Sequence, residues 1–260
     1  MPELPDLEIY KENLKPKILN KKITGASVHK SKVLKNTLPA DFEREVIGKS
    51  VSNIQRRGKM LIFSLSSDKK LIAHLMLYGQ MNWQRAEDEI DSETCIIIEF
   101  GKNQLRFVDS TGWMHISFDE KRLEKVGMEP LLAQFTIESF QEILKRKQLG
   151  DVKGRLTDQK LIAGIGNAYV DEILWEAKIN PSRVASLLKE KEVEALFKSI
   201  QKVINESIRE VRKRLKGEIF GEPREFLAVH RKKECPNCFA KIRRIELNKK
   251  GTYFCPRCQK

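Results

Sequence analysis

The segment 231–260 reads RKKECPNCFAKIRRIELNKKGTYFCPRCQK and holds all but one of the five cysteines in this 260-residue chain. They form two C-x2-C pairs, Cys235/Cys238 and Cys255/Cys258, with sixteen residues between the pairs. Each pair supplies two thiolates from one tight turn, and two such turns complete a tetrahedral Zn²⁺ site without an open position for water. The spacing therefore predicts one structural zinc ion in a C-terminal zinc-ribbon hairpin.

The same segment is strongly basic. It contains ten Lys or Arg and two Glu, a net charge of 10 − 2 = +8, in a chain whose total is 49 − 36 = +13. This charge favours a polyanionic partner such as a phosphate backbone, although charge alone does not separate nucleic acid from a membrane surface. A disulfide-stapled tail and a ribbon that binds protein are the alternative interpretations.

The remaining sequence shows how the chain is organised. We expect a helix over 5–18, opened by Pro5, and then short β-rich runs whose spacing predicts a sandwich or barrel. These runs cover 23–29, 51–56, 60–65, 71–77, 95–100 and 105–108. Beyond Gly127 the pattern becomes helical, with a long amphipathic helix over 193–211. No apolar run reaches the roughly 18 residues that span a bilayer, so we expect a cytoplasmic protein.

Met1-Pro2-Glu3 opens the chain. A small second residue allows removal of the initiator Met, which would leave a secondary amine on Pro2. An α-amino group titrates near 7.7–8, against about 10.4 for lysine, so much more of it is neutral and nucleophilic at neutral pH. Glu3 would stand beside it as a proton donor and acceptor. Taken alone, this segment is more simply interpreted as an ordinary start of the chain, with Glu3 as an acidic residue at the beginning of a helix.

Two further stretches contain candidate phosphate contacts. Lys59 follows Gly58 in a predicted hairpin and would project toward a phosphate or a reacting sugar, unless it is a solvated hairpin tip. Asn167 follows Gly164-Ile165-Gly166 and precedes a predicted helix, whose N-terminus attracts an anion. Simple helix capping is the alternative for Asn167.

The segment from His74 leaves a predicted strand and enters a turn. Met76, Leu77 and Tyr78 would either wedge into a base stack or pack in the core at the strand end. His74 is either a phosphate contact or a buried histidine with satisfied hydrogen bonds. Cys95, the odd cysteine, lies in an apolar run and is expected to be a buried, inert thiol.

Together, several ordered motifs resemble the family of formamidopyrimidine-DNA glycosylase and endonuclease VIII, whose members carry a helix–two-turn–helix motif. They are Pro2–Asp6, Arg57–Lys59, Asp158–Asn167 and Gly251–Gln259, and the match runs nearly end to end. The resemblance implies an α+β multidomain fold. We expect an N-terminal helix plus β-sandwich catalytic domain over 1–120, a helical helix–two-turn–helix domain over 121–225 and a zinc finger over 226–260.

The resemblance also implies a base-excision-repair enzyme that acts as a monomer on damaged double-stranded DNA. Pro2 would be the Schiff-base nucleophile, Glu3 its proton-transfer partner and Lys59 a phosphate contact that assists catalysis. The abasic site would then be cut by β,δ-elimination, without a redox cofactor or a catalytic metal. Further DNA contacts implied by the family are Lys153, Asn167 and the residue at the zinc-hairpin tip. That tip normally carries an Arg, and Lys250 keeps its charge but loses the bidentate fork.

The residues that would determine lesion preference resemble two different branches of the family. The 8-oxoguanine enzymes usually insert an Arg-Phe pair from a second loop, but here that loop, Val108–Met114, lacks the arginines and has Trp113 in place of the phenylalanine. Met76-Leu77-Tyr78 instead resembles the wedge of endonuclease VIII, while residues 2–5 and 163–167 favour the 8-oxoguanine enzymes. We therefore favour an oxidised pyrimidine or ring-opened base over 8-oxoguanine. A non-catalytic binder of damaged or branched DNA is a further alternative.

Overall fold

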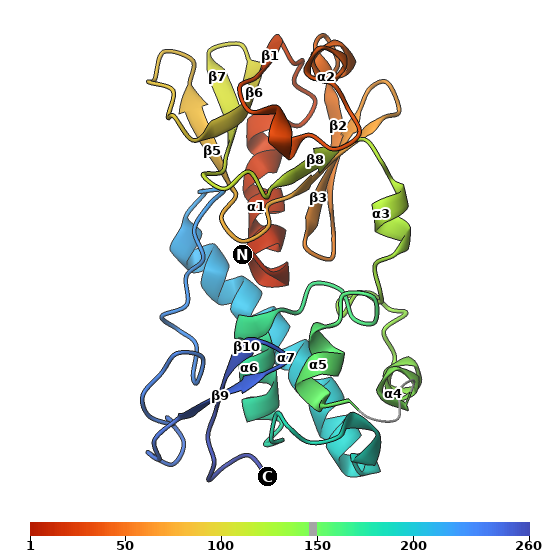
Figure 1. Ribbon diagram of the computed structural model, residues 1–260, viewed down its shortest axis with the longest axis vertical. Helices are drawn as coiled ribbons and strands as arrows, with labels where there is room; N and C mark the ends of the chain where they lie inside the picture. Colours follow the sequence, from red (N-terminus) through yellow and green to blue (C-terminus); the bar gives the residue numbers. More distant parts are fainter. Residues whose placement is uncertain (146–149) are drawn as a thin grey trace. The chain divides into compact units, whose positions relative to one another are not determined.

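The computed structural model describes residues 1–145 and 150–260, which divide into two compact units (Figure 1). Unit 1 comprises 1–124 and 211–222, and unit 2 comprises 125–210 and 223–260. Within the described ranges, no helix is long and apolar enough to cross a bilayer.

Unit 1 begins with helix α1 (Leu4–Ile18), which matches the predicted helix. Pro5 lies in its first turn, where the missing N–H costs nothing, and the Asp6 carboxylate accepts a hydrogen bond from the backbone N–H of Glu3 at 2.8 Å. Leu7, Leu14 and other apolar residues of α1 are buried. The helix therefore begins at a fixed point, directly after Pro2 and Glu3.

Two four-stranded antiparallel sheets follow, in the orders β2-β3-β4-β8 and β1-β6-β7-β5. The strands are β1 (Gly25–Val28), β2 (Val51–Arg57), β3 (Met60–Leu65), β4 (Lys70–His74), β5 (Gln80–Arg85), β6 (Thr94–Phe100), β7 (Asn103–Val108) and β8 (His115–Ser117). Phe63 of β3 and Phe107 of β7 meet edge to face, with ring centroids 6.5 Å apart. The two sheets thus share one core, which confirms the predicted β-sandwich.

Several elements of unit 1 carry too weak a sequence pattern to be predicted. Helix α2 (Pro39–Val46) buries only Phe42 and Val46, and β5 is mostly polar. β8 has three residues, and the short helix α3 (Lys121–Glu124) buries none. β4 ends at His74 rather than at Leu77 because Met76 adopts φ 57°, a left-handed conformation that ends a strand.

Unit 2 contains four helices among its described residues and a C-terminal hairpin. The helices are α4 (Ile137–Lys145), α5 (Val152–Thr157), α6 (Asn167–Glu176) and most of α7 (Glu190–Leu215). The hairpin consists of the antiparallel strands β9 (Arg243–Leu247) and β10 (Lys250–Phe254). The helical character expected beyond Gly127 is confirmed. Among these helices, α5 has no counterpart in the sequence pattern, because it spans just six residues.

Candidate active site and nucleic-acid contacts

The N-terminal end of α1 carries the predicted nucleophile and its partner. Pro2 is buried, and Glu3 is 4% exposed at the N-cap of the helix. Met1 is part of this chain, so the nitrogen of Pro2 is here a tertiary amide and becomes an amine only when Met1 is removed. The structure thus places both residues at one helix terminus.

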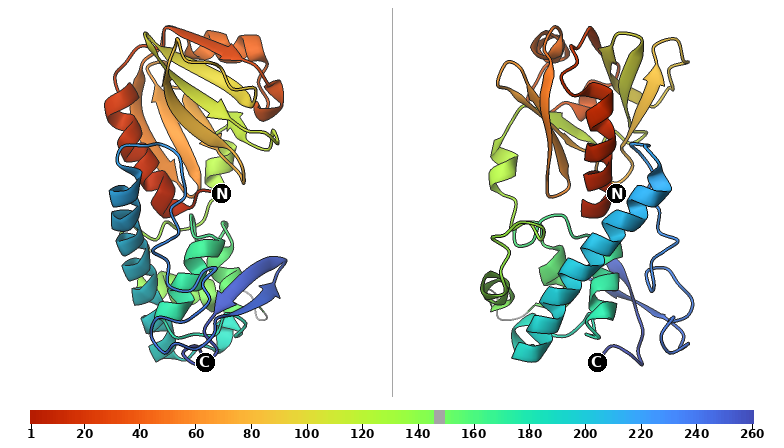
Figure 2. Two further views of the ribbon diagram at one scale, coloured as in Figure 1. Left: turned by 90° about the vertical axis from the view of Figure 1, so that its left-hand side faces the viewer. Right: turned by 180° about the vertical axis from the view of Figure 1, so that it is seen from behind.

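The β2–β3 hairpin brings Lys59 to the same end of unit 1. Its turn, Gly58, adopts φ 56°, and Arg56 donates to the Gly58 carbonyl at 3.0 Å. Arg56 also pairs with Glu8 of α1 at 2.9 Å, which ties the hairpin to the helix. Figures 1 and 2 show the hairpin turn and the N-terminus at the same end of unit 1. Lys59 is buried there and is therefore not a solvated hairpin tip.

His74 lies close to Lys59. Burial, the positive charge of Lys59 and that of Arg122 lower the pKa of His74 to about 4, so the ring is neutral at neutral pH. The backbone N–H of Met76 donates to His74 Nδ1 at 3.1 Å, which leaves the ring proton on Nε2. His74 therefore offers a neutral N–H donor and also holds the start of the Met76 loop. The sequence gives no sign that Arg122 lies near His74, because Arg122 follows no motif.

The two candidate wedge loops meet through aromatic side chains. Leu77, Tyr78 and Trp113 are 47%, 58% and 49% exposed, and the rings of Tyr78 and Trp113 lie 6.3 Å apart. In the second loop, the Asp109 carboxylate accepts the backbone N–H groups of Thr111 at 2.8 Å and Met114 at 2.6 Å. Leu77, Tyr78 and Trp113 are therefore not core residues, and together they form an exposed apolar surface.

Gly79 fixes the shape of the first loop. A Cβ at this position would lie 2.3 Å from the carbonyl oxygen of Leu75, a contact that backbone cannot relieve. The tight closure after Leu75, together with the left-handed Met76, turns Leu77 and Tyr78 away from the sheet.

In unit 2, the hairpin tip and the start of α6 lie together. Asn167 is the first residue of α6, and its side-chain amide donates to the Gly251 carbonyl at 2.9 Å. Lys250, the preceding residue on β10, is exposed, and its ammonium lies 3.3 Å from Thr157 Oγ1. The structure therefore brings the predicted phosphate contacts Asn167 and Lys250 to one place.

Lys153 has a different position from the one expected of a phosphate contact. It is 1% exposed, pairs with Asp171 at 2.7 Å and donates to Thr252 Oγ1 at 2.9 Å. Asp171 also binds His230 Nδ1 at 2.7 Å. Lys153 thus joins α5, α6 and β10 from the interior, because an ammonium without surface exposure satisfies its donors inside the protein. Asp171 was missed, although an acid within the apolar run of α6 is a signal of such a network.

The cysteines fit one zinc ion. Their Sγ atoms all lie within 4.8 Å of one another, with Cys235–Cys258 at 3.9 Å and Cys238–Cys255 at 3.5 Å. A tetrahedron with Zn–S bonds of about 2.3 Å has edges of about 3.8 Å. Burial opposes ionisation of Cys235, but hydrogen bonds from Trp175 and from the backbone of Asn237 and Cys238 lower its pKa to about 6. Together these distances support one structural Zn²⁺.

Cys95 lies outside this group. It is fully buried, and burial raises the pKa of its thiol. This confirms the expectation of a buried residue, and a thiol that stays protonated is a poor nucleophile.

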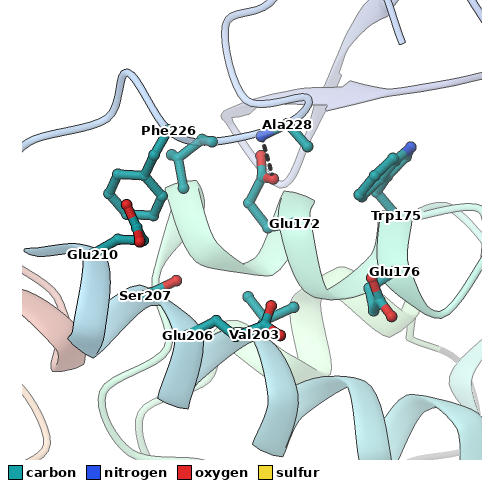
Figure 3. Close-up of a pocket in the computed structure, with 10 residues that line it drawn as sticks. Glu172, Trp175, Glu176, Val203, Glu206, Ser207, Glu210, Phe226 and Ala228 are labelled. Carbon is teal, nitrogen blue, oxygen red and sulfur yellow. Dashed lines mark hydrogen bonds between the residues drawn. The ribbon is translucent and has the colours of Figure 1, made fainter. Parts of the chain in front are cut away.

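A pocket of about 300 Å³ lies in unit 2 between α6, α7 and residues 226–228 (Figure 3). Its acidic lining residues are Glu172, Glu176, Glu206 and Glu210. The Glu172 carboxylate accepts the backbone N–H groups of Ala228 at 2.7 Å and His230 at 2.8 Å, which anchors the segment leading to the zinc hairpin. This acidic lining is unfavourable for binding phosphate.

Family comparisons cover most of the chain. Residues 1–116 match the formamidopyrimidine-DNA glycosylase N-terminal domain, and 126–216 match the H2TH domain of the same enzymes. Residues 232–260 match the zinc finger found in FPG and IleRS. A formamidopyrimidine-DNA glycosylase of Carboxydothermus hydrogenoformans is 36% identical over 267 residues, and one of Listeria monocytogenes is 33% identical over 275 residues. Each alignment covers 100% of both chains.

Solved structures agree with these matches. The Lactococcus lactis FPG bound to DNA containing FAPY-dG superimposes with a TM-score of 0.90 at 31% identity. The Lactococcus lactis Fpg in complex with an abasic site containing DNA gives a TM-score of 0.89 at 30% identity. Both comparisons cover 99% of each chain. The chain therefore belongs to the formamidopyrimidine-DNA glycosylase family.

Proposed function

We propose that this protein is a base-excision-repair DNA glycosylase with AP-lyase activity, acting through an N-terminal proline. The observation that carries the proposal is the convergence of Pro2, Glu3 and the Lys59 hairpin at one end of unit 1. The full-length relatives named formamidopyrimidine-DNA glycosylase support it, as do the related structures with lesion-containing DNA.

In the proposed reaction, the damaged nucleotide leaves the duplex so that an amine can reach its C1′ atom. After removal of Met1, Pro2 attacks C1′, the base departs, and Glu3 protonates the ring oxygen as the sugar opens to an iminium ion. The iminium ion acidifies the C2′ proton, so β-elimination and then δ-elimination break the strand on both sides of the sugar. Lys59 stabilises the nearby phosphate throughout.

Each unit has candidate donors to phosphate. His74 Nε2–H, the N-terminus of α6 at Asn167 and the exposed Lys250 ammonium are suitable donors to phosphate. Lys153 contributes indirectly in this proposal, because it holds β10 through Thr252 and does not reach the surface. Zn²⁺ at the cysteines would fix the hairpin that presents Lys250.

The exposed loops favour a wedge of Met76, Leu77 and Tyr78. Their apolar surface, extended by Trp113, can fill the space left by a flipped nucleotide. We propose an oxidised pyrimidine or a ring-opened base as the preferred lesion, since the second loop has no arginine to insert. The alternative is an enzyme specific for 8-oxoguanine and formamidopyrimidine. The names of the relatives refer to formamidopyrimidine, a ring-opened purine that fits both proposals.

A panel of single-lesion duplexes tests this proposal. The processed protein is expected to release an oxidised pyrimidine or ring-opened purine and to leave a gap with phosphate at both ends. Base release and strand cleavage are measured separately, by mass spectrometry and on a denaturing gel. Binding without product on any lesion, abasic sites included, would refute the enzymatic proposal and favour the non-catalytic binder. Faster release of 8-oxoguanine would overturn only the lesion preference.

Replacement of Lys250 by Arg is expected to tighten binding to an abasic duplex about three- to tenfold. Arginine restores two parallel donors to phosphate, whereas lysine acts as a point charge. Fluorescence anisotropy at fixed salt measures the effect, and Lys249→Arg on the same turn is the matched control. Equal affinities for wild type, K250R and K249R would argue against a phosphate contact at Lys250.

A further inference from the structure

The segment 212–222 is fastened along α1 within unit 1. Arg212 forms a two-pronged pair with Glu12, with N–O distances of 2.9 and 2.8 Å. Asn13 donates to the Glu218 carbonyl at 2.7 Å, and the Tyr10 hydroxyl donates to the Gly221 carbonyl at 2.7 Å. The segment thus contacts Glu12 and Asn13 first and then, at Gly221, reaches Tyr10, which lies closer to the N-terminus of α1. This segment is therefore guided to the end of the helix where Pro2 lies.

The last residue of this segment, Glu222, meets the chain terminus. Its Oε1 atom lies 2.8 Å from the Met1 ammonium, and the two side chains are 33% and 30% exposed. Ile219 is fully buried, and Gly221 adopts φ 94°, a conformation that favours glycine and directs the chain past Tyr10. The position of Glu222 thus follows from packing and backbone geometry, in addition to its ion pair.

We propose that Glu222 is the carboxylate partner of the catalytic N-terminal amine. The inference rests on the proposed function and adds a residue to it. Met1 N and Pro2 N are separated by three covalent bonds of about 1.3–1.5 Å, so the two nitrogens lie within about 4 Å of each other. When Met1 is removed, the positively charged amine is that of Pro2 instead of Met1. This shift in position is shorter than a glutamate side chain, so Glu222 can follow it.

Two consequences follow for the reaction. As the Pro2 lone pair forms the bond to C1′, the glycosidic electron pair leaves with the base and the proline nitrogen becomes positive. Glu222 accepts the N–H proton from that nitrogen and passes it to solvent, so it is again a carboxylate when ring opening forms the iminium ion beside it. A fixed anion beside a developing cation lowers the barrier to its formation. The same anion also stabilises the protonated free amine and so raises its pKa.

These opposing effects give Glu222→Gln a distinctive pH profile. Single-turnover cleavage of an abasic duplex by the Met1-processed protein should rise with pH as the amine loses its proton. In E222Q, we expect the plateau to fall about tenfold or more and the midpoint to move about 0.5–1 unit toward lower pH. Glu218→Gln removes an exposed carboxylate from the same segment and should leave both quantities at wild-type values.

The two proposals fail in distinguishable ways. An E222Q profile that superimposes on that of wild type overturns the role of Glu222 as partner of the catalytic amine. This is also the result expected if Glu222 only binds a retained Met1. A lower plateau with an unchanged midpoint also contradicts it, because a loosened fold reduces activity without changing the amine pKa. Glu222→Asp keeps the charge and should show the same midpoint of the pH profile as wild type. It provides a second variant for the test if E222Q folds poorly. A wild-type protein that cleaves no abasic DNA would instead refute the proposed function.

Discussion

Blocking the N-terminal amine is expected to reduce cleavage of abasic DNA at least 1,000-fold. An uncleaved peptide extension before Pro2 turns its nitrogen into a tertiary amide, which has no basic lone pair to attack C1′. The lysine side chains remain available, but at a pKa near 10.4 they are mostly protonated at neutral pH. Single-turnover cleavage with enzyme in excess measures the loss, and anisotropy shows whether DNA binding persists.

The matched control is the same chain after the extension has been removed to expose Pro2. Activity should then return, since nothing else in the protein has changed. Pro2→Gly is expected to lose the covalent intermediate as well, because it replaces the rigid secondary amine by a flexible primary amine. Equal rates before and after removal of the extension would contradict a role for the Pro2 nitrogen.

Loss of zinc is expected to weaken binding to an abasic duplex at least 100-fold. Structural Zn²⁺ contributes apparent binding free energies of about 10–16 kcal/mol in zinc-finger peptides, and that energy is folding energy. Without the ion, the thiolates of Cys235, Cys238, Cys255 and Cys258 repel one another, and the hairpin loses the anchor that presents Lys250. Unit 1 should keep its fold, because its sandwich has its own core.

Cys258→Ser with a zinc assay and anisotropy at fixed salt tests this expectation. Cys95→Ala is the control, since Cys95 lies in the sandwich and outside the cysteine group. It should retain one zinc per chain and near wild-type DNA affinity. A zinc-free C258S protein that binds abasic DNA as tightly as wild type would show that the hairpin does not contribute to the grip.

The sequence predicts those parts of the fold that carry their own local signal. The cysteine spacing predicts the zinc hairpin because thiolate geometry is set within two short turns. Pro5 predicts the start of α1, and β-rich runs predict most strands of the sandwich. Elements such as α5 and β8 are too short to show a period, and they form only because neighbouring elements cover them.

The positions of buried charged residues are harder to predict from the sequence. Lys153 and Lys250 are both lysines in a basic chain, yet one is buried against Asp171 and the other is exposed. Only the packing of α5, α6 and β10 separates them. Glu222 likewise has no motif of its own, because its place depends on contacts that its segment makes with α1, 200 or more positions away in the sequence. The proposed catalytic pair, Pro2 and Glu3, does have a signal in the sequence, because a nucleophilic α-amino group would have to lie at the chain end.

Borohydride trapping followed by mapping of the modified residue tests the central claim most directly. Borohydride reduction of the intermediate that the processed protein forms with an abasic duplex should yield a stable covalent adduct. Peptide mass spectrometry should then locate the sugar on the nitrogen of Pro2. Lys59 is the informative alternative, since it is the amine on the hairpin tied to α1. An adduct on Lys59 or another lysine, or none with active protein, would contradict the account.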